Sequence, residues 1–560
     1  MPQRSALTLN LVIIVGFLTL CPVLMLLLGS FMEGFGEFNG LTVQKYVTAY
    51  TDPGLQEMLL NTLIFTLGSA TVATTLALFL AYMNTRTNIP FKFAFKVISI
   101  VPMMIPHILF CVSWALLLNP SNGILNKLFM SLFGLENAPF DIYSLWGMIM
   151  VEGLLDLPIA YLILAPAMQS FDVSLEESSK VCGASNWKTL LRITLPVLRP
   201  AILSAIILVI VRSLASFAAP SVLGIPGRIY VLPTHIYRMI STGFSADYGQ
   251  AAAIGMSALA ASIVLIYLYR YLTSESARFV TISGRGFKPS VIDLKRYKYP
   301  LFAVVGVLSF VLIVLPIIVL LYASFLPYIM VPSFKAFSMM SLQNWNEVLS
   351  DPISLLSLKN SLMLGIGGAT LGVMLSILVA YVIVKVRTKL AGVLESLSFL
   401  SFSFPGIVVG VGFMWFFVQT PLYGTIWALL IGYIATYLPY GIRPMSSAFV
   451  QIHASLEESS RVSGAGAFTT MKRIVIPLLI PGIVSGWILM ATMFVRELTL
   501  SVVLSRPGSE VLAVQILRFS EDGLWGQLSA LGIMMIVISS TLVVGVTWIG
   551  NRFSGMNAKG

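Results

Sequence analysis

Residues 175–196 read LEESSKVCGASNWKTLLRITLP, a polar stretch in a chain that is otherwise strongly apolar. Residues 456–477, LEESSRVSGAGAFTTMKRIVIP, repeat this stretch 281 positions later, and 12 of the 22 aligned residues are identical. A second copy at that distance indicates a chain built from two related halves, each carrying the polar element once. The element therefore decides how the rest of the sequence is divided.

The sequence around the two copies is typical of a membrane protein. Of 560 residues, 57% are hydrophobic and 10% are charged, and the mean hydropathy is +0.92. Soluble proteins have about 45–50% apolar and about 25% charged residues. Lipid offers no hydrogen-bond partner to a backbone N–H or C=O, so apolar runs of about 20 residues are predicted to be transmembrane helices. We expect an all-α polytopic membrane protein.

Twelve such helices are predicted. They cover roughly residues 9–31, 59–83, 94–118, 143–168, 198–218, 249–271, 300–325, 360–384, 395–419, 424–447, 479–502 and 526–549. The first run is too long for the hydrophobic core of a signal peptide, so we interpret it as a retained span. Six helices in each half keep the two halves parallel to each other.

Further matches between the halves extend the duplication. VLGIPG, which ends at Gly227, matches VLSRPG, which ends at Gly508, again at an offset of 281. Earlier in each half the offset is 299, because Pro106 matches Pro405. The difference of 18 residues indicates an insertion in the first half, around residues 119–141. We predict a first half of residues 1–272, a basic cytoplasmic linker of residues 273–299 and a second half of residues 300–560.

The loop charges predict the orientation. With the N-terminus inside, 24 of the 34 Lys and Arg residues lie in inside segments, eight lie in outside segments and two lie within spans. Positive residues collect on the cytoplasmic side of membrane proteins, so both termini are predicted to be cytoplasmic. This bias also accounts for the net charge of +11. We therefore predict contact with the lipid bilayer and no binding of nucleic acid.

Each polar copy is predicted to form a helix, a glycine break and a second helix. Both lie on the inside, between the fourth and fifth spans of their half. Gly183 is placed to end the first helix in a left-handed conformation, and Ser185 to cap the next. Glu176, Glu177 and Lys180 are expected to face water. One copy alone would fit an amphipathic helix at the lipid headgroups, but two copies favour docking of a two-fold symmetric partner.

The stretch resembles the EAA motif of type I ABC importer permeases, E-A-A-x3-G-x9-I-x-L-P. At the motif positions stand Glu177, Ser178, Ser179, Gly183, Ile193, Leu195 and Pro196 in the first copy, and Glu458, Ser459, Ser460, Gly464, Ile474, Ile476 and Pro477 in the second. The departures are Ser-Ser for Ala-Ala and Ile476 for leucine. The segments RSLASFAAPSVLG and VRELTLSVVLSRPGSEVLAVQI further resemble the ferric-iron branch, in which two permease halves are fused.

This resemblance implies a transport subunit that is not itself an enzyme. In such permeases the motif is the coupling element that contacts a homodimeric ATPase, here residues 172–196 and 453–477. The implied contact residues are Glu176, Glu177, Ser178, Ser179, Gly183, Ala184, Glu457, Glu458, Ser459, Ser460, Gly464 and Ala465. The sequence has no GxxxxGK[ST] phosphate loop, so we expect ATP and Mg on the separate ATPase. The resemblance also implies an extracytoplasmic binding protein and a bacterial cytoplasmic (inner) membrane.

Five charged residues are predicted within the spans. They are Glu152, Asp156, Arg212, Arg496 and Glu497. Charges at membrane depth are costly and often functional, so all five are candidates for the translocation cavity. The alternative is that arginines and carboxylates pair to hold the bundle together. Under the offset of 281, Glu152 corresponds to Tyr433 and Arg496 to Ala215, so the set is not symmetric.

The cargo stays open at this level. We expect ferric iron, with a phosphonate, a sugar phosphate, a polyamine or thiamine as alternatives for the same machinery. A secondary transporter of twelve spans in two parallel halves is the alternative class, and dependence of uptake on ATP would distinguish it. The three cysteines and three histidines are scattered along the chain, so no resident metal site and no catalytic group is predicted.

Overall fold

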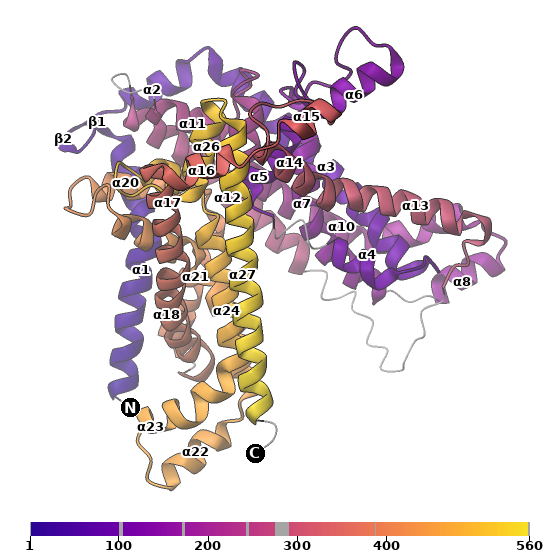
Figure 1. The fold of residues 1–560 in the computed structure, drawn as a ribbon. Coiled ribbons are helices and arrows are strands. Elements are labelled where there is room, and N and C mark those ends of the chain that lie inside the picture. The colour runs from indigo at the N-terminus through magenta and orange to yellow at the C-terminus, as the bar shows by residue number, and fades with distance from the viewer. Residues whose placement is uncertain are drawn as a thin grey trace. The chain divides into compact units, whose positions relative to one another are not determined.

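The computed structural model of the protein describes residues 2–99, 105–170, 174–241, 246–274, 291–386 and 388–557. Helices dominate this part of the chain, in which the only strands are the antiparallel pair β1 (Met32–Gly34) and β2 (Glu37–Leu41) (Figure 1). The α-helices are α1 (Pro2–Ser30), α2 (Gln44–Thr51), α3 (Gly54–Arg86), α4 (Lys92–Ile98), α5 (His107–Leu118), α6 (Ile124–Phe133), α7 (Leu145–Gln169), α8 (Ser174–Val181), α9 (Asn186–Thr189), α10 (Leu195–Ala215), α11 (Leu232–Ser241), α12 (Tyr248–Ser274), α13 (Lys298–Ser309), α14 (Leu315–Ser324), α15 (Phe334–Ser338), α16 (Gln343–Ser350), α17 (Pro352–Leu362), α18 (Ala369–Tyr381), α19 (Lys389–Leu400), α20 (Gly406–Phe417), α21 (Ile426–Gln451), α22 (Ala454–Val462), α23 (Ala467–Thr470), α24 (Ile476–Val495), α25 (Ser501–Leu504), α26 (Leu512–Glu521) and α27 (Trp525–Asn557).

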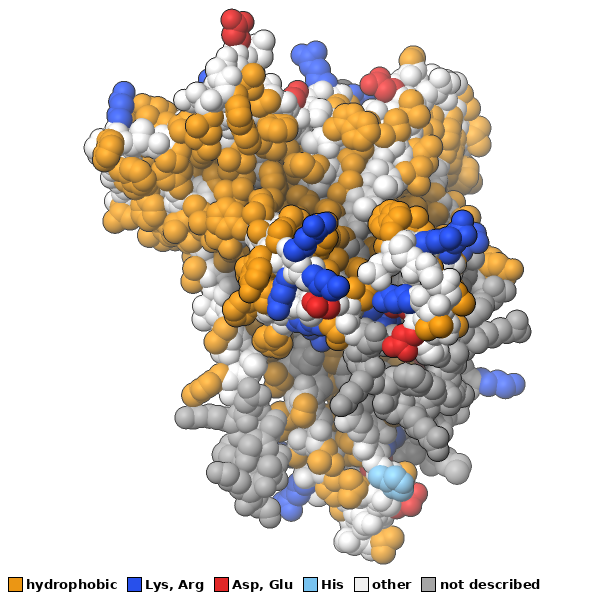
Figure 2. All heavy atoms as spheres, turned by 90° about the vertical axis from the view of Figure 1, so that its right-hand side faces the viewer, with side chains coloured by type: hydrophobic (Ala, Val, Ile, Leu, Met, Phe, Trp, Pro, Cys, Tyr) orange, Lys and Arg blue, Asp and Glu red, His pale blue; other side chains and the backbone are white. Residues whose placement is uncertain are grey.

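Within the described residues, nine helices are long and apolar enough to cross a membrane. They are Ala6–Ser30, Gly54–Arg86, Leu145–Gln169, Asn186–Ala215, Tyr248–Tyr269, Lys295–Ser324, Pro352–Val386, Phe468–Val495 and Trp525–Trp548. Figure 2 shows hydrophobic side chains over much of one face. The residues of α1 between Leu9 and Leu28 alone expose eight large hydrophobic side chains. Such a surface suits contact with lipid tails, and the predicted all-α membrane class is confirmed.

The third and ninth predicted spans are not single helices. α5 begins directly after Pro106 and α20 directly after Pro405, whereas α4 and α19 precede them as separate helices. The backbone angles of the two prolines almost agree, with φ −55° and ψ 130° at Pro106 and φ −58° and ψ 134° at Pro405. Proline has no N–H and disfavours helical backbone in the preceding residue, so a new helix starts at each. Residues 100–104 of the third prediction lie outside the described residues.

The tenth and eleventh predicted spans also differ from the structure. α21 has 26 residues and contains two prolines and Arg443, and it is not among the nine described helices apolar enough to cross a membrane. α24 ends at Val495 rather than at residue 502, so Arg496 and Glu497 follow the helix instead of lying inside it. α10 ends at Ala215, which corresponds to Arg496 under the offset of 281. The fifth and eleventh spans therefore end within one residue of equivalent positions.

The chain forms two compact units that do not follow the two sequence halves. Unit 1 comprises Met1–Thr51, Ile236–Leu259 and Trp345–Gly560, and unit 2 comprises Asp52–His235 and Ala260–Asn344. The first helix of each half therefore packs in the unit that holds most of the other half. In unit 1, α1 packs on α19 and α20, and in unit 2, α13 and α14 pack on α4 and α5.

The two exchanged helices make equivalent contacts. In unit 2, the Ser113 hydroxyl of α5 donates a hydrogen bond to the Pro316 carbonyl oxygen at 3.1 Å. In unit 1, a Cβ at Gly412 of α20 would lie 2.0 Å from the Pro22 carbonyl oxygen, so only glycine permits this approach. Ser113 and Gly412 correspond under the offset of 299. Both halves thus place the proline of their first span against the third span of the other half.

The interior of unit 2 depends on close packing of α3 and α7. A Cβ at Gly153 would lie 2.7 Å from side-chain atoms of Val72, so glycine lets these two helices approach each other. Asn84 donates a hydrogen bond to the Tyr161 hydroxyl at 3.0 Å across the same contact. Small residues and buried hydrogen bonds are the usual means of joining helices where no hydrophobic driving force acts between them.

Residues 291–299, which form the C-terminal part of the predicted linker, are attached to unit 2. Residues 275–290 lie outside the described residues. The Ile292 N–H donates to the Arg86 carbonyl oxygen at 2.8 Å, and the Asn88 N–H donates to the Ile292 carbonyl oxygen at 3.2 Å. The Asn88 side chain donates to Asp293 Oδ1 at 2.6 Å. The N–H of Lys295 and the Asn88 side chain hold the pKa of Asp293 below its ordinary value.

The inserted segment of the first half contains α6. The buried Asn126 side chain donates hydrogen bonds to the carbonyl oxygens of Leu118 and Phe140 at 2.9 and 2.8 Å. These bonds close the base of the segment between α5 and α7. The predicted insertion around residues 119–141 therefore forms a folded segment of its own.

Candidate functional site

Each half presents its polar element as two short helices that meet at a glycine. The first docking element consists of α8, Gly183 and α9, and the second of α22, Gly464 and α23. We use these names for residues 174–189 and 454–470. Residues 172 and 173 of the predicted first element lie outside the described residues.

The glycine break has the predicted geometry in both copies. Gly183 has φ +83° and Gly464 has φ +81°, a left-handed conformation that other residues adopt only with strain. The Ala184 N–H donates to the Ser179 carbonyl oxygen at 3.1 Å, and the Ala465 N–H donates to the Ser460 carbonyl oxygen at 3.0 Å. This is the hydrogen bond of a Schellman helix end, and it satisfies a carbonyl group that the helix leaves free.

A side-chain hydrogen bond joins the two short helices in each element. The hydroxyls of Ser179 and Thr189 lie 3.0 Å apart in the first, and those of Ser460 and Thr470 lie 2.8 Å apart in the second. Ser185 caps α9 by accepting a hydrogen bond from the Lys188 N–H at 3.3 Å, as predicted. The angle between the short helices is therefore held by the same contact in both copies.

The outer face of each element exposes matching side chains. They are Leu175, Glu177, Ser178, Val181 and Trp187 in the first element, and Leu456, Glu458, Ser459, Val462 and Phe468 in the second. Val181 is 88% exposed and Val462 is 90% exposed. Apolar side chains held in the open at matching positions of two polar elements indicate a surface for another protein.

The prediction that Glu176 faces water is wrong. This side chain is 4% exposed, and its Oε1 accepts a hydrogen bond from the Thr194 hydroxyl at 2.7 Å. The guanidinium of Arg86, at the end of α3, also attracts it. A carboxylate is costly to bury unless it is paired and hydrogen-bonded, and these partners allow Glu176 to turn inward. Its neighbour Glu177 is exposed, as predicted, and Lys180 is half-buried.

The corresponding glutamate of the second element is held in a similar way. Glu457 is 8% exposed, and its Oε1 lies 3.4 Å from Lys385 Nζ. Lys385 Nζ also donates a hydrogen bond to the Ile452 carbonyl oxygen at 2.7 Å. In both elements the glutamate that precedes the motif points into the protein, and the motif glutamate that follows it points outward.

Each docking element continues directly into a membrane span. A π-helical turn joins α9 to α10 over Leu190–Thr194, and another joins α23 to α24 over Met471–Val475. The two turns lie at the same offset of 281, and the prolines that follow fall in the first turn of the span, as predicted for Pro196. A force on the second short helix therefore acts directly on the fifth or eleventh span.

The first half gathers its membrane charges into one cluster. Arg212 Nε lies 2.8 Å from Asp156 Oδ1, and the Ser213 hydroxyl donates to Asp156 Oδ2 at 3.2 Å. One turn away on α7, Glu152 Oε2 accepts a hydrogen bond from the Ser216 hydroxyl at 2.9 Å. Asp156 is fully buried and Glu152 is 4% exposed, whereas the Arg212 side chain is 33% exposed. The structure thus brings three of the five predicted residues together.

The second half places a different cluster at the equivalent positions. The Tyr437 hydroxyl donates a hydrogen bond to Glu497 Oε2, and the Leu500 N–H donates to Glu497 Oε1 at 2.7 Å. The Tyr433 hydroxyl lies 2.6 Å from the Ser501 hydroxyl. Arg496 donates to the Met493 sulfur at 3.1 Å. Here one carboxylate is held by a phenol and a backbone N–H.

The tyrosines and serines of these clusters were not predicted. A search for ionisable groups at membrane depth passes over hydroxyls, although they supply most of the hydrogen bonds. The repeat could have identified them, because under the offset of 281 Tyr437 is equivalent to Asp156 and Glu497 is equivalent to Ser216. Within the described ranges, no three His, Cys, Asp or Glu side chains lie close enough together to hold a metal ion.

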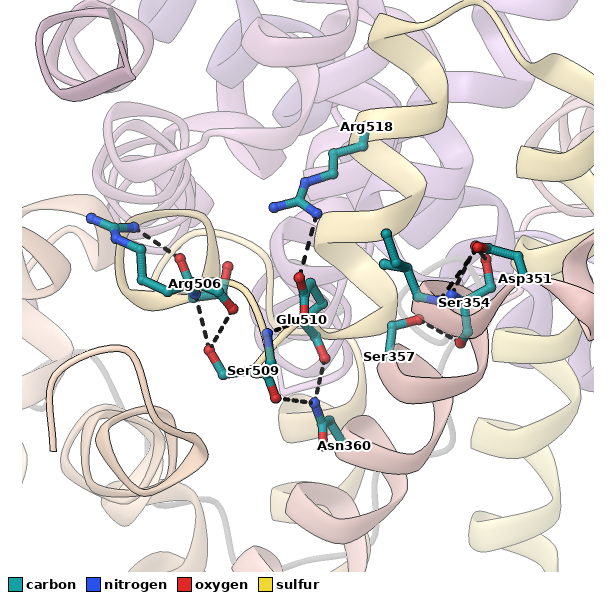
Figure 3. A network of polar contacts seen from close by, with 11 residues as sticks. Asp351, Ser354, Ser357, Asn360, Arg506, Ser509, Glu510 and Arg518 are labelled. Atoms are coloured by element: carbon teal, nitrogen blue, oxygen red, sulfur yellow. Dashed lines mark hydrogen bonds and ion pairs between the residues drawn. The ribbon is translucent and has the colours of Figure 1, made fainter. Parts of the chain in front are cut away.

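A second polar network holds the segment between α25 and α26 (Figure 3). The Arg506 N–H donates to the Ser509 hydroxyl at 2.9 Å, and the Asn360 side chain donates to the Glu510 carbonyl oxygen at 2.9 Å. Arg518 lies 3.8 Å from the Glu510 carboxylate, which is almost fully buried. These contacts hold the backbone that follows the eleventh span, including the end of the VLSRPG stretch.

Known proteins resemble this chain over most of its length. The family described as the binding-protein-dependent transport system inner membrane component matches residues 73–275 and again residues 372–555. The chain is 28% identical over 553 residues to a ferric transport system permease protein of Actinobacillus pleuropneumoniae, covering 97% of this chain and 77% of that protein. It is 24% identical over 548 residues to an Fe(3+)-transport system permease protein of Haemophilus influenzae, covering 96% and 97%.

Shorter matches involve proteins that correspond to part of the chain. A spermidine/putrescine transport system permease protein of Haemophilus influenzae is 28% identical over 231 residues, 41% of this chain and 88% of that protein. Among solved structures, a bacterial ABC transporter involved in the import of the acidic polysaccharide alginate matches with a TM-score of 0.37 and 22% identity, covering 48% of this chain and 93% of that chain. Because the family matches both halves and together most of the chain, the protein belongs to the binding-protein-dependent transport system inner membrane components and contains two of them in one polypeptide.

Proposed function

We propose that this chain is the permease of an ATP-driven importer that passes ferric iron into the cytoplasm by alternating access. The cargo would be delivered by an extracytoplasmic binding protein. The observation that carries the proposal is the pair of docking elements, which share their glycine geometry, their internal hydrogen bonds and their exposed side chains. Two equivalent surfaces on one chain suit a partner with two equivalent sites.

The partner that fits these surfaces is a homodimeric ATPase. Its copies would bind ATP and Mg, because the sequence has no phosphate loop of its own. The exposed Glu177 and Glu458, with the apolar side chains beside them, would contact the two ATPase copies. Closure of the ATPase dimer would push on α9 and α23, and the π-helical turns would carry that push into α10 and α24.

Ferric iron is the favoured cargo because the relatives that align over nearly the whole chain are iron-transport permeases. A polyamine is the second candidate, since a spermidine/putrescine permease aligns with 41% of the chain. A phosphonate, a sugar phosphate and thiamine remain alternatives for the same machinery. The polar clusters do not separate these cargoes, because each buried carboxylate is hydrogen-bonded within its own unit.

The five charged residues remain candidates for the translocation cavity. Asp156 and Glu497 have partners on neighbouring elements and are buried, which favours a role in holding the bundle. Arg212 and Arg496 are partly exposed and are therefore the members best placed to meet cargo or to line its path.

We place both termini in the cytoplasm, with the chain in the bacterial inner membrane. Loop charge supports this orientation. In unit 1, the N-terminal end of α1 and the C-terminal end of α27 lie at the same end as the second docking element (Figure 1). An ATPase that docks there would bind on the same side of the membrane as both termini.

The proposal is tested with the tagged chain purified from its own host in mild detergent. We expect an ATPase to co-purify, and membrane vesicles that contain both proteins and the binding protein to accumulate radioactive ferric iron only with ATP. Spermidine in the same assay serves as the cargo control. Uptake of spermidine in place of iron would reject the cargo and keep the machinery. Uptake driven by an ion gradient without ATP would instead support the twelve-span secondary transporter.

A further inference from the structure

Opposite charges of the first docking element and of the second span are buried near each other. Arg86 is the last residue of α3 and is 1% exposed, and Glu176 of α8 is 4% exposed. Their charges attract each other, and Tyr82, one turn before Arg86, lies near enough to Glu176 to interact with its charge. The same carboxylate accepts the hydrogen bond of Thr194 at 2.7 Å. Glu176 therefore connects the docking element with both the second and the fifth spans.

An equivalent pair joins the second docking element to the eighth span. Lys385 lies in the last turn of the span Pro352–Val386, and its Nζ is 3.4 Å from Glu457 Oε1 of α22. The two side chains are 14% and 11% exposed. Lys385 also donates to the Ile452 carbonyl oxygen at 2.7 Å, so it holds the backbone just before the docking element.

The two cation–glutamate pairs correspond to each other under the repeat. Arg86 matches Lys385 at the offset of 299, and Glu176 matches Glu457 at the offset of 281. The cation has changed from Arg to Lys, and the supporting contact has changed from the Thr194 hydroxyl to the Ile452 carbonyl oxygen. The opposite charges are the feature that both halves share.

Stability alone is a poor explanation for these pairs. Removing two charges from water costs free energy that their attraction barely returns, and apolar residues of similar volume often stabilise a protein as well or better. A charge pair does provide a specific, directional contact between two elements. Here that contact links the element on the cytoplasmic surface to a span to which it is not covalently continuous.

We propose that the pairs Arg86–Glu176 and Lys385–Glu457 transmit movement of each docking element to the second span of its half. The π-helical turn alone would move only the fifth or eleventh span. With the pair in place, the second and fifth spans move together, and so do the eighth and eleventh. These four are positioning residues, since none needs to touch cargo or ATP. The inference rests on the proposed function, because it assumes that a partner pushes on the docking elements.

The second pair is the better one to test, because it is less deeply buried than the first. The variants are Lys385→Gln, Glu457→Gln, the double variant and Lys385→Arg, with Lys389→Gln as the matched control. Lys389 is exposed and lies four residues further along. The complex with its co-purified ATPase and binding protein is reconstituted in lipid vesicles. Iron uptake and ATP hydrolysis are then measured in the same sample.

We expect Lys385→Gln and Glu457→Gln each to lower the iron moved per ATP about fivefold while ATP hydrolysis changes less than about twofold. The double variant should be no worse than either single one, because both remove the same contact. Lys385→Arg should keep most of the wild-type ratio, and Lys389→Gln all of it. An unchanged ratio in both single variants, or effects that multiply in the double variant, would overturn the proposal.

A second measurement does not depend on the ATPase. In the purified chain alone, hydrogen exchange in residues 454–462 should be about tenfold faster in Lys385→Gln than in Lys389→Gln, because the docking element has lost its attachment. Equal exchange in these two variants means that no such attachment exists. If exchange rises but no ATPase co-purifies with the wild-type chain, the contact stands and the proposed function fails.

Discussion

Residues 174–196 and 453–477 have nearly the same local structure in the two halves. The polar clusters in the spans, in contrast, are built from different residues in each half. The docking elements share a left-handed glycine, a Ser–Thr hydrogen bond and an exposed valine at equivalent positions. In the clusters, Asp156 with Arg212 in the first half is replaced by Tyr437 with Glu497 in the second. The same duplicated chain has thus kept one region and changed another.

The difference agrees with the contacts that we propose for each region. A surface that meets two copies of one partner is constrained twice by the same shape, so both copies of the surface stay alike. A buried cluster only has to satisfy its own hydrogen bonds, and an ion pair or a phenol–carboxylate pair can each do so. Symmetry between the halves thus agrees with the proposed two-fold partner, and asymmetry agrees with internal packing or contact with an asymmetric cargo.

The largest effect is expected at the ion pair of the first cluster. Arg212→Ala leaves the fully buried Asp156 without its cation, which should lower the stability of the protein by about 3 kcal/mol. The thermal unfolding midpoint in detergent measures this loss, with Lys359→Gln on an exposed site as the control. Adding Asp156→Asn to Arg212→Ala should recover part of the stability. A midpoint that does not move would mean that the pair contributes nothing to the bundle.

In the second cluster we expect a smaller loss from Tyr437→Phe. The variant removes the hydroxyl that donates to the buried Glu497 and leaves one carboxylate oxygen unsatisfied, at a cost of about 1–3 kcal/mol. Tyr433→Phe is the matched control, because Ser501 keeps a second bond to the Glu497 carbonyl oxygen. Equal effects of the two variants on the unfolding midpoint would contradict the special role of Tyr437.

Substitution of the docking glycines should affect both halves alike. Gly183→Leu and Gly464→Leu each force leucine into a left-handed conformation, at a cost of about 1–2 kcal/mol, and should lower ATP-dependent uptake about tenfold. No atom lies within 4 Å of the added Cβ, so the effect comes from backbone strain rather than from a clash.

The matched controls lie in the same elements. Gly466 has no positive φ, and Gly466→Ser introduces the capping residue that the first element has at Ser185, so this variant should be neutral. Gly183→Asn should retain most uptake, because asparagine tolerates the left-handed conformation. The proteins should remain in the membrane at wild-type levels, as measured by immunoblotting. Full uptake in both leucine variants would reject the docking interpretation.

The Ser–Thr hydrogen bonds give the most direct comparison of the two halves. Ser179→Ala and Ser460→Ala should each destabilise their docking element by about 0.5–1.5 kcal/mol. Faster hydrogen exchange in α8 and α22, by a similar factor, would report this loss. A large difference between the two factors would show that the elements are less alike in energy than in geometry.

The smallest expected effect is the loss of stability at acid pH from the ion pair of Lys45 and Asp247. Lys45 Nζ lies 3.0 Å from Asp247 Oδ2. Burial alone would raise the pKa of Asp247, but the Gln250 N–H and the Lys45 ammonium outweigh it and lower the pKa below 3.8. The stability that the pair contributes is therefore present above the ordinary aspartate value and is lost as pH falls through the lowered one. For a partly exposed pair we expect less than about 1 kcal/mol.

Comparing thermal unfolding of the wild type and Asp247→Asn between neutral pH and pH below 3.8 tests this sign. The difference between the two proteins should shrink on acidification. The Lys359→Gln variant, at an exposed site, serves as the control. A difference that grows at low pH would reverse the argument.

Periodicity and repeat spacing predicted much of the fold. Long apolar runs yielded the spans, because lipid leaves a helix as the only way to satisfy their backbone. The repeat found the docking elements and their glycines, whose left-handed geometry only a small set of residues can adopt. Hydropathy failed at Pro106 and Pro405, where the apolar run continues but the proline interrupts the helix. It also failed at Glu176, where a charge that looked solvent-exposed has partners from distant segments.

The sequence by itself determined the membrane class, the duplication, and the place and shape of the docking elements, because these depend on local composition and spacing. Only the tertiary structure decided which helices pack together, including the exchange of first helices recorded by Pro22 at Gly412 and Pro316 at Ser113. It also decided that Lys385 forms an ion pair with Glu457 and that Arg86 is buried near the charge of Glu176. Such pairings join residues far apart in the chain, and their energies depend on burial and distance, which no local pattern records.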